Sequence, residues 1–261
     1  MSVTCTATVI SEHARCPHYG VCGGCTLQHL SWSDYQAHKH KQLLRQLAAA
    51  GLVIQHLEPL RTVPPASRRR TTLVARQDKA GQLTLGYHQR ASQAVVAVDS
   101  CLVLCPALQQ ALITLRGVLA SLSFKQADIA LTATAMGVDM QWLGALRQGQ
   151  QAALTAAIAA NTQFCRLSLA EKIVFCRQPT QVQLGGVWVD LPPGAFLQAS
   201  AVGEQLLQQA VLRHTVGTSV ADLFTGLGTL ALPLAAQGYR VLAVDSATAS
   251  LHALAATQRV R

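Results

Sequence analysis

The sequence lacks any run of eighteen apolar residues, roughly the length that a helix needs to cross a membrane. The first fifteen residues also lack the apolar core of a secretory signal peptide, and Glu12 and His13 stand among them. No low-complexity tract is present, and apolar residues make up 50% of the chain, which is enough for a core. We therefore expect a folded, soluble, cytoplasmic protein without a membrane partner.

The sequence also has few charged residues, and fewer of them are negative than positive. Asp, Glu, Lys and Arg make up 13% of the chain, against about a quarter in ordinary globular domains. The chain has 21 Lys and Arg but 12 Asp and Glu, so its net charge is +9, and most of this excess lies in the first hundred residues. This balance favours a polyanionic partner, and nucleic acid in particular. The alternative is a set of solvated arginines without a partner.

Three cysteines lie within ten residues, at Cys16, Cys22 and Cys25, and glycines between them allow the backbone to wrap closely around a bound object. In an intracellular protein such a group indicates a metal centre rather than disulfides. A zinc ion and an iron–sulfur cluster are both candidates, because both are held by cysteine thiolates. The neighbouring His18 and His29 are interpreted as ordinary surface or core residues.

The remaining pattern predicts an α/β plus α+β fold in three parts. Residues 1–60 should hold the cluster segment and a basic helix that starts at Ser31 and ends at Gly51. We expect this helix to turn Tyr35, Leu43, Leu44 and Leu47 inward. Residues 61–190 should form a central sheet domain, in which hairpin signals predict antiparallel strands. Residues 191–261 should begin a doubly wound, Rossmann-like domain.

A strand, a glycine loop, a helix, a second strand and a second helix are predicted from residue 219 onward. Asp222 lies near the end of the first strand, Gly226 and Gly228 form the loop, and Asp245 ends the second strand. A carboxylate at that place can accept hydrogen bonds from ribose hydroxyls. The motif is compatible with a dinucleotide, since Ala231 can replace the third glycine, but its Asp-Leu-Phe-Thr-Gly wording favours S-adenosylmethionine.

Four segments carry a resemblance to a known family. They are Cys16–His29, Cys101–Leu108 with its Cys-x3-Cys-Pro wording, Phe196–Ser200, and Asp222–Gly226. In this order they resemble the motifs of the iron–sulfur family of RNA (uracil-5-)-methyltransferases, which are class I, S-adenosylmethionine-dependent enzymes that make 5-methyluridine in rRNA or tRNA. The central strands, up to the Gly-Tyr-His near residue 87, resemble that family's central sheet.

The resemblance implies a 4Fe-4S cluster held by four cysteine ligands, Cys16, Cys22, Cys25 and Cys101. Cys105 is a competing fourth ligand, but the alignment of the following proline favours Cys101. Zinc remains the second choice.

The resemblance also implies S-adenosylmethionine as methyl donor and an rRNA or tRNA substrate. The implied cofactor contacts are Gln198, Phe224 and Asp245. Two positions depart from the family, which commonly has Glu in place of Asp245 and Asn in place of Ser200. An acid at the strand end can still accept ribose hydroxyls, so Asp245 is retained.

Methylation of uracil carbon 5 needs a cysteine thiolate that adds to carbon 6 and a base that later removes the carbon 5 proton. In the family both lie beyond the second strand, and this sequence, which ends at Arg261, contains neither, so no catalytic residue is assigned. We therefore expect an incomplete methyltransferase domain. Either a second polypeptide completes it, or the reading frame is truncated.

The expected function is RNA methylation, without transfer by this chain alone. The alternative is a non-catalytic iron–sulfur RNA-binding module or a fragment of such an enzyme.

Overall fold

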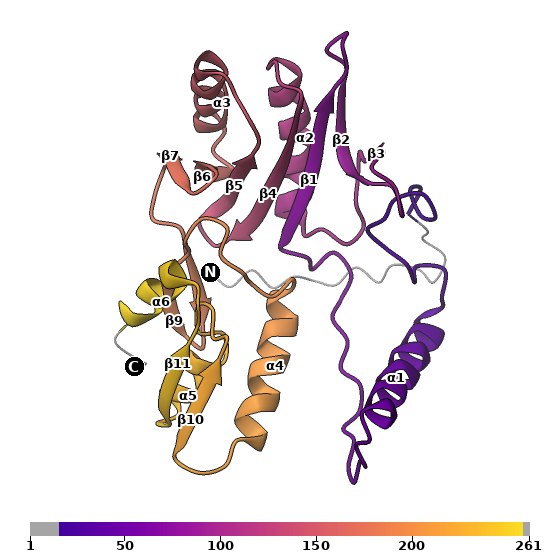
Figure 1. Ribbon diagram of the computed structural model, residues 1–261, viewed down its shortest axis with the longest axis vertical. Helices are drawn as coiled ribbons and strands as arrows, with labels where there is room; N and C mark the ends of the chain where they lie inside the picture. Colours follow the sequence, from indigo (N-terminus) through magenta and orange to yellow (C-terminus); the bar gives the residue numbers. More distant parts are fainter. Residues whose placement is uncertain (1–15, 258–261) are drawn as a thin grey trace.

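The computed structural model describes residues 16–257 (Figure 1). Residues 1–15 of the predicted cluster segment, and residues 258–261 at the end of the predicted doubly wound part, lie outside this range. No helix of the described residues is long and apolar enough to span a membrane.

The central part is a seven-stranded sheet with the order β3-β2-β1-β4-β5-β6-β7. Its elements are β1 (Arg70–Gln77), β2 (Leu83–His88), β3 (Val95–Ala97), α2 (Pro106–Ala120), β4 (Gln126–Thr134), β5 (Gly137–Leu143), α3 (Gln148–Ala160), β6 (Phe164–Leu169) and β7 (Lys172–Cys176). Five of the six strand pairs are antiparallel, as the hairpin signals predicted. The prediction of antiparallel strands is wrong at the sixth pair, because β5 and β6 run parallel. Helix α3 connects these two strands as a crossover, and a parallel pair requires such a connection.

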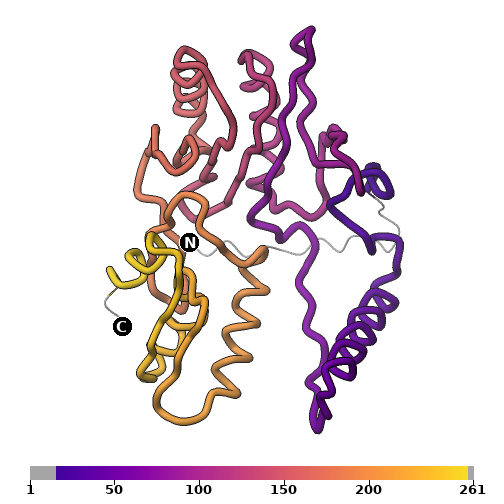
Figure 2. Tube along the Cα trace, in the orientation of Figure 1, coloured from indigo at the N-terminus to yellow at the C-terminus, as the bar shows by residue number. Residues whose placement is uncertain are grey.

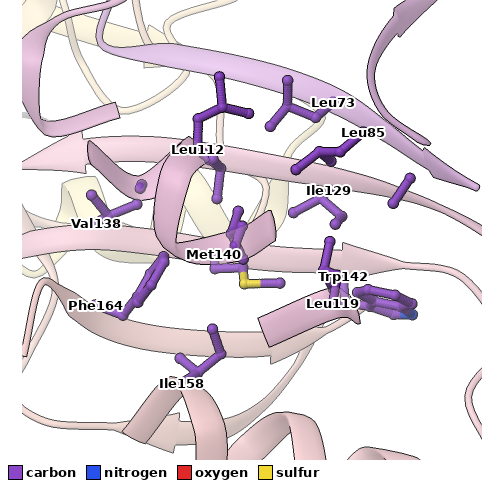
Figure 3. Packing of buried hydrophobic residues seen from close by; sticks show 14 of the residues in the cluster. Leu73, Leu85, Leu112, Leu119, Ile129, Val138, Met140, Trp142, Ile158 and Phe164 are labelled. Atoms are coloured by element: carbon purple, nitrogen blue, oxygen red, sulfur yellow. The ribbon is translucent and has the colours of Figure 1, made fainter. Parts of the chain in front are cut away.

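The main core lies between this sheet and helices α2 and α3 (Figure 3). Strand β4 turns alternate side chains, Ala127, Ile129 and Leu131, into the core, as expected for a sheet with one covered face. Trp142 on β5 is fully buried, and Phe124 meets it edge to face with ring centroids 5.1 Å apart. The cysteine loop is attached to this body at the end of β2.

The carboxyl-terminal part forms a second, smaller body (Figure 2). It contains β8 (Gln181–Leu184), β9 (Val187–Asp190), α4 (Ala201–His214), β10 (Ser219–Leu223), α5 (Ala231–Ala236), β11 (Arg240–Val244) and α6 (Thr248–Ala255). The β8–β9 hairpin does not join the central sheet: Val182, Leu184 and Val189 pack with Leu232 of α5 and Leu254 of α6.

Strands β10 and β11 form a two-stranded parallel sheet. One of its faces is covered, since Val241 packs against Ala231 and Leu234 of α5. On the other face Leu223 and Leu242 are 62% and 56% exposed, with Val244 beside them. Parallel sheets are normally covered on both faces, so this face lacks a layer within the described part of the chain.

Helix α1 (Trp32–Ala49) begins where the sequence predicted, at the Ser31 cap, whose hydroxyl accepts a hydrogen bond from the backbone N–H of Asp34. The expectation that its leucines pack inward is wrong for Leu43 and Leu44, which are each 39% exposed. The helix stands apart from the other helices (Figure 1), and none of its residues is buried.

Candidate cofactor edge and cysteine cavity

The first candidate site is the loop between β10 and α5. Phe224 and Gly226 adopt positive φ angles of 62° and 56°, and the loop is tied to β11 by the backbone N–H of Thr225, which donates to Val244 O at 3.1 Å. Gly228 also has a positive φ, and a Cβ there would lie 2.6 Å from a methyl carbon of Leu254. The two glycines therefore allow a tight turn at the carboxyl edge of the parallel sheet.

Asp245 fixes this loop from the neighbouring strand. One carboxylate oxygen accepts the backbone N–H of Gly226 at 2.7 Å, and the other accepts that of Ala247 at 2.8 Å. Hydrogen bonds from the backbone N–H groups of Ala247, Gly226 and Ser246 hold the pKa of Asp245 below its ordinary value. A carboxylate has about four acceptor positions, so the same group can still accept hydrogen bonds from a ligand.

The other predicted cofactor residues take different positions around this edge. Asp222 accepts a hydrogen bond from the Thr225 hydroxyl at 2.8 Å and so braces the loop from within. The Phe224 side chain is 88% exposed and stands out into solvent. Five of the predicted cofactor residues thus lie together, on the β10–α5 loop and the strand ends beside it: Asp222, Phe224, Gly226, Gly228 and Asp245.

Gln198 lies on a separate segment that is attached to the central sheet. Its backbone carbonyl accepts a hydrogen bond from Arg69 Nε at 3.1 Å, and Arg70 donates to the carbonyl of Leu197 at 2.8 Å. The Arg70 guanidinium also lies 4.7 Å from the centroid of the Phe196 ring. No hydrogen bond among the described residues joins Gln198 to the β10–α5 loop.

The second candidate site is a cavity of about 140 Å³ lined by all four predicted ligand cysteines, Cys16, Cys22, Cys25 and Cys101. Burial and the three neighbouring thiols raise the pKa of the Cys25 thiol, while a hydrogen bond with Gln28 lowers it. Among residues 16–257, however, no three Cys, His, Asp or Glu side chains converge on the position of a single metal ion.

The cysteine loop is held against the end of β2 and the residues that follow it. The backbone N–H of Gly23 donates to His88 O at 2.9 Å, and that of Arg90 donates to Val21 O at 3.0 Å. A Cβ at residue 23 would lie 2.9 Å from His88 O, so the close approach requires glycine. Tyr87, whose hydroxyl is 2.7 Å from that of Thr71, also lines the cavity, and burial raises its pKa.

Cys101 reaches the cavity from the segment before α2. Cys105 caps that helix and packs against the central core, and it is not among the residues that line the cavity. Sequence reasoning overlooked Gln109, whose side chain binds the backbone of Cys101, because a glutamine on a helix carries no distinguishing pattern.

Several known proteins are similar to this chain in sequence. No protein-family model matches the chain. An uncharacterized RNA methyltransferase of Caulobacter vibrioides is 37% identical over 251 residues, which cover 92% of this chain and 60% of that protein. The 23S rRNA (uracil(1939)-C(5))-methyltransferase RlmD of Pseudomonas putida is 35% identical over 270 residues, covering 95% and 58%. The homologues of this chain are RNA methyltransferases. The chain spans about three fifths of the length of these relatives.

A solved structure shows the same fold. The tRNA (uracil-54, C5)-methyltransferase of Pyrococcus abyssi, in complex with S-adenosyl-L-homocysteine, matches with a TM-score of 0.72 over 90% of this chain and 61% of that protein. Because the sequences are 20% identical, this likeness establishes the fold alone, a mixed α/β fold with a central mixed sheet.

Proposed function

We propose that this chain is part of an S-adenosylmethionine-dependent methyltransferase that acts on carbon 5 of a uridine in rRNA or tRNA. The observation that carries the proposal is the Asp245–Gly226 hydrogen bond, which preorganises a loop and a carboxylate at the carboxyl edge of a parallel sheet. Nucleotide cofactors bind at this edge in open α/β folds. The names of the relatives supply the RNA substrate and the reaction class.

In this proposal Asp245 accepts hydrogen bonds from the ribose of the cofactor, and the Asp222–Gly228 loop lies along its adenosine part. Phe224 is free to pack against the base because its side chain has no cover in the described chain. Gln198 approaches the methyl-donor end from the segment that Arg69 and Arg70 anchor. The nucleophile that adds to carbon 6 and the base for carbon 5 are assigned to none of the 261 residues.

We propose that the four cysteines, which line one cavity, hold a 4Fe-4S cluster, with a zinc ion as the second choice. The cluster would be ligated by Cys16, Cys22, Cys25 and Cys101, and it would join the amino-terminal segment to the central sheet domain.

We further propose that another polypeptide segment covers the open face of the β10–β11 sheet and brings the nucleophile. The support is the apolar character of that face, with Leu223, Leu242 and Val244 exposed. The second candidate function is a non-catalytic iron–sulfur RNA-binding module. This function would follow if no other segment covered the open face and supplied a nucleophile.

Deletion of the gene that encodes this chain distinguishes these functions. Mass spectrometry of nucleosides from separately purified rRNA and tRNA should show less 5-methyluridine in one of the two RNA classes, and the gene returned on a plasmid should restore it. Full 5-methyluridine content in both RNA classes of the deletion strain would contradict the methyltransferase proposal.

A further inference from the structure

Helix α1 differs from every other helix of residues 16–257, because each of the others has at least one buried residue and α1 has none. A helix that is exposed on most of its circumference needs either favourable solvation or a partner. The amino-terminal end of α1 is connected to the cysteine loop, because the helix starts seven residues after Cys25.

The charge on α1 is positive and uncompensated. Lys39, Lys41 and Arg45 lie on it, and its one acidic residue, Asp34, is engaged at the helix start by the Ser31 hydroxyl at 2.8 Å. Within the described residues, none of the three cationic side chains forms an ion pair. A shallow hollow on this face is lined by residues three or four positions apart, namely His38, Lys41, Gln42, Arg45 and Gln46.

An aromatic pair adjoins these cations. The rings of Trp32 and Tyr35 are stacked, with centroids 5.7 Å apart and planes 14° apart, and Trp32 is 47% exposed. The Lys39 ammonium lies 5.8 Å from the Tyr35 ring centroid. Positions 35, 39, 42 and 46 follow helical spacing, so the aromatic pair adjoins the hollow at its Gln42 and Gln46 edge. Lys41 lines the opposite edge of the hollow, roughly 160° around the helix axis from Lys39.

We propose that α1 binds RNA across the half of its circumference that extends from Lys41 through Arg45 to Lys39, with phosphates on these three cations and an unpaired base stacked on Trp32. The inference rests on the proposed function and adds a surface remote from the β10–α5 loop. Unpaired cations spaced along a groove follow a phosphate backbone, and aromatic rings bind the faces of unstacked bases. An acidic protein would match the charge but would leave the exposed aromatic pair without a role.

The test is RNA binding by the full chain, measured by fluorescence anisotropy with unmodified rRNA and tRNA transcripts at several salt concentrations. The variant Lys39→Gln/Lys41→Gln/Arg45→Gln removes three charges from α1. Each single-stranded phosphate contact contributes roughly 0.7 to the slope of log affinity against log salt, so the slope should fall by about 2 and the affinity at about 0.1 M salt by roughly 100-fold.

The matched control is Lys79→Gln/Lys125→Gln/Lys172→Gln, which removes the same charge from three exposed lysines of the central sheet domain. Its affinity should stay within about twofold of the unchanged protein, because these lysines are proposed to touch no phosphate. A second variant, Trp32→Ala, should weaken binding about tenfold with the salt slope unchanged, since stacking involves no counterion release.

Four outcomes would overturn the inference. Equal losses in the α1 variant and its control would show a diffuse charge effect, and no loss in the α1 variant would place the RNA elsewhere while leaving the proposed function intact. Binding of poly-glutamate as tightly as RNA would identify α1 as a protein-binding surface. If the unchanged protein bound no RNA at all while the deletion strain lost 5-methyluridine, the α1 surface would fail and the methyltransferase would stand.

Discussion

The side chain of Gln109 binds both backbone hydrogen-bonding groups of Cys101. The N–H of Cys101 donates to Gln109 Oε1 at 3.2 Å, and Gln109 Nε2 donates to the carbonyl of Cys101. The amide thus pairs with this residue as a neighbouring strand would, and it fixes the one cavity cysteine that comes from a distant segment.

Gln109→Ala should therefore release Cys101 and destabilise the protein. The loss of two partly buried hydrogen bonds is expected to lower the free energy of unfolding by about 1–3 kcal/mol, as measured by urea denaturation. Gln110→Ala is the matched control, because Gln110 is exposed on the same helix. Equal changes in the free energy of unfolding for the two substitutions would show that the Gln109 hydrogen bonds do not stabilise the protein.

Cys101→Ser and Cys105→Ser separate the two candidates for the fourth ligand. Protein purified without oxygen should absorb broadly at roughly 400 nm, where iron–sulfur charge transfer falls. Cys101→Ser should lose most of this absorption and of the bound iron, whereas Cys105→Ser should keep both, because Cys105 caps α2 away from the cavity. The reverse result would exchange their roles, and zinc in place of iron would exclude the cluster.

The Arg69–Glu204 ion pair joins the central sheet domain to α4, with Nη2 and Oε2 2.7 Å apart and side chains 14% and 4% exposed. Arg69→Ala would leave the Glu204 carboxylate buried without its partner, at a cost of about 3–5 kcal/mol in the free energy of unfolding. The control Glu204→Gln removes the charge as well and should cost less.

This pair also predicts a pH dependence. Burial raises the pKa of Glu204 even with Arg69 present, and removing Arg69 raises it further. A carboxyl with a raised folded-state pKa binds its proton more tightly in the folded protein than in the unfolded one. The Arg69→Ala protein should therefore be more stable at about pH 5 than at about pH 7.5, relative to the unchanged protein. A deficit that does not vary with pH would show that the lost packing, not the charge, is responsible.

The open face of the β10–β11 sheet should cause the isolated chain to associate. Leu223→Gln/Leu242→Gln should reduce self-association in sedimentation velocity without altering the circular dichroism spectrum, since both side chains are exposed. Val241→Gln, on the covered face of the same sheet, should unfold that body instead. Unchanged association of the double variant would mean that this face needs no cover.

Local signals were sufficient for much of this fold. The Ser31 cap fixes the start of α1, and the glycine loop with acids at two strand ends predicted β10, β11 and the loop between them. Strand pairing was harder to predict from the sequence. The direction of β5 against β6 depends on the crossover through α3. The position of the β8–β9 hairpin depends on its packing on α5 and α6. Periodicity identified an apolar side of α1, but only the tertiary structure shows that Leu43 and Leu44 have little to pack against.

The residues of the candidate sites were also predicted only in part. The cysteine spacing indicated a metal centre, and the resemblance supplied Cys101, which the structure places at the same cavity. Residues that act through backbone contacts, such as Gln109 and Arg69, have no sequence signature, because their partners lie on other elements.

Release of tritium from RNA labelled at carbon 5 of uridine tests the central claim most directly, because methylation at that carbon displaces its hydrogen. RNA from the deletion strain would be incubated with S-adenosylmethionine and extracts of cells carrying the unchanged gene, no gene, or the Asp245→Asn variant. We predict release that depends on S-adenosylmethionine with the unchanged gene, none without the gene, and at least tenfold less with the variant, whose amide cannot accept at both positions. Equal release from all three extracts would contradict the account.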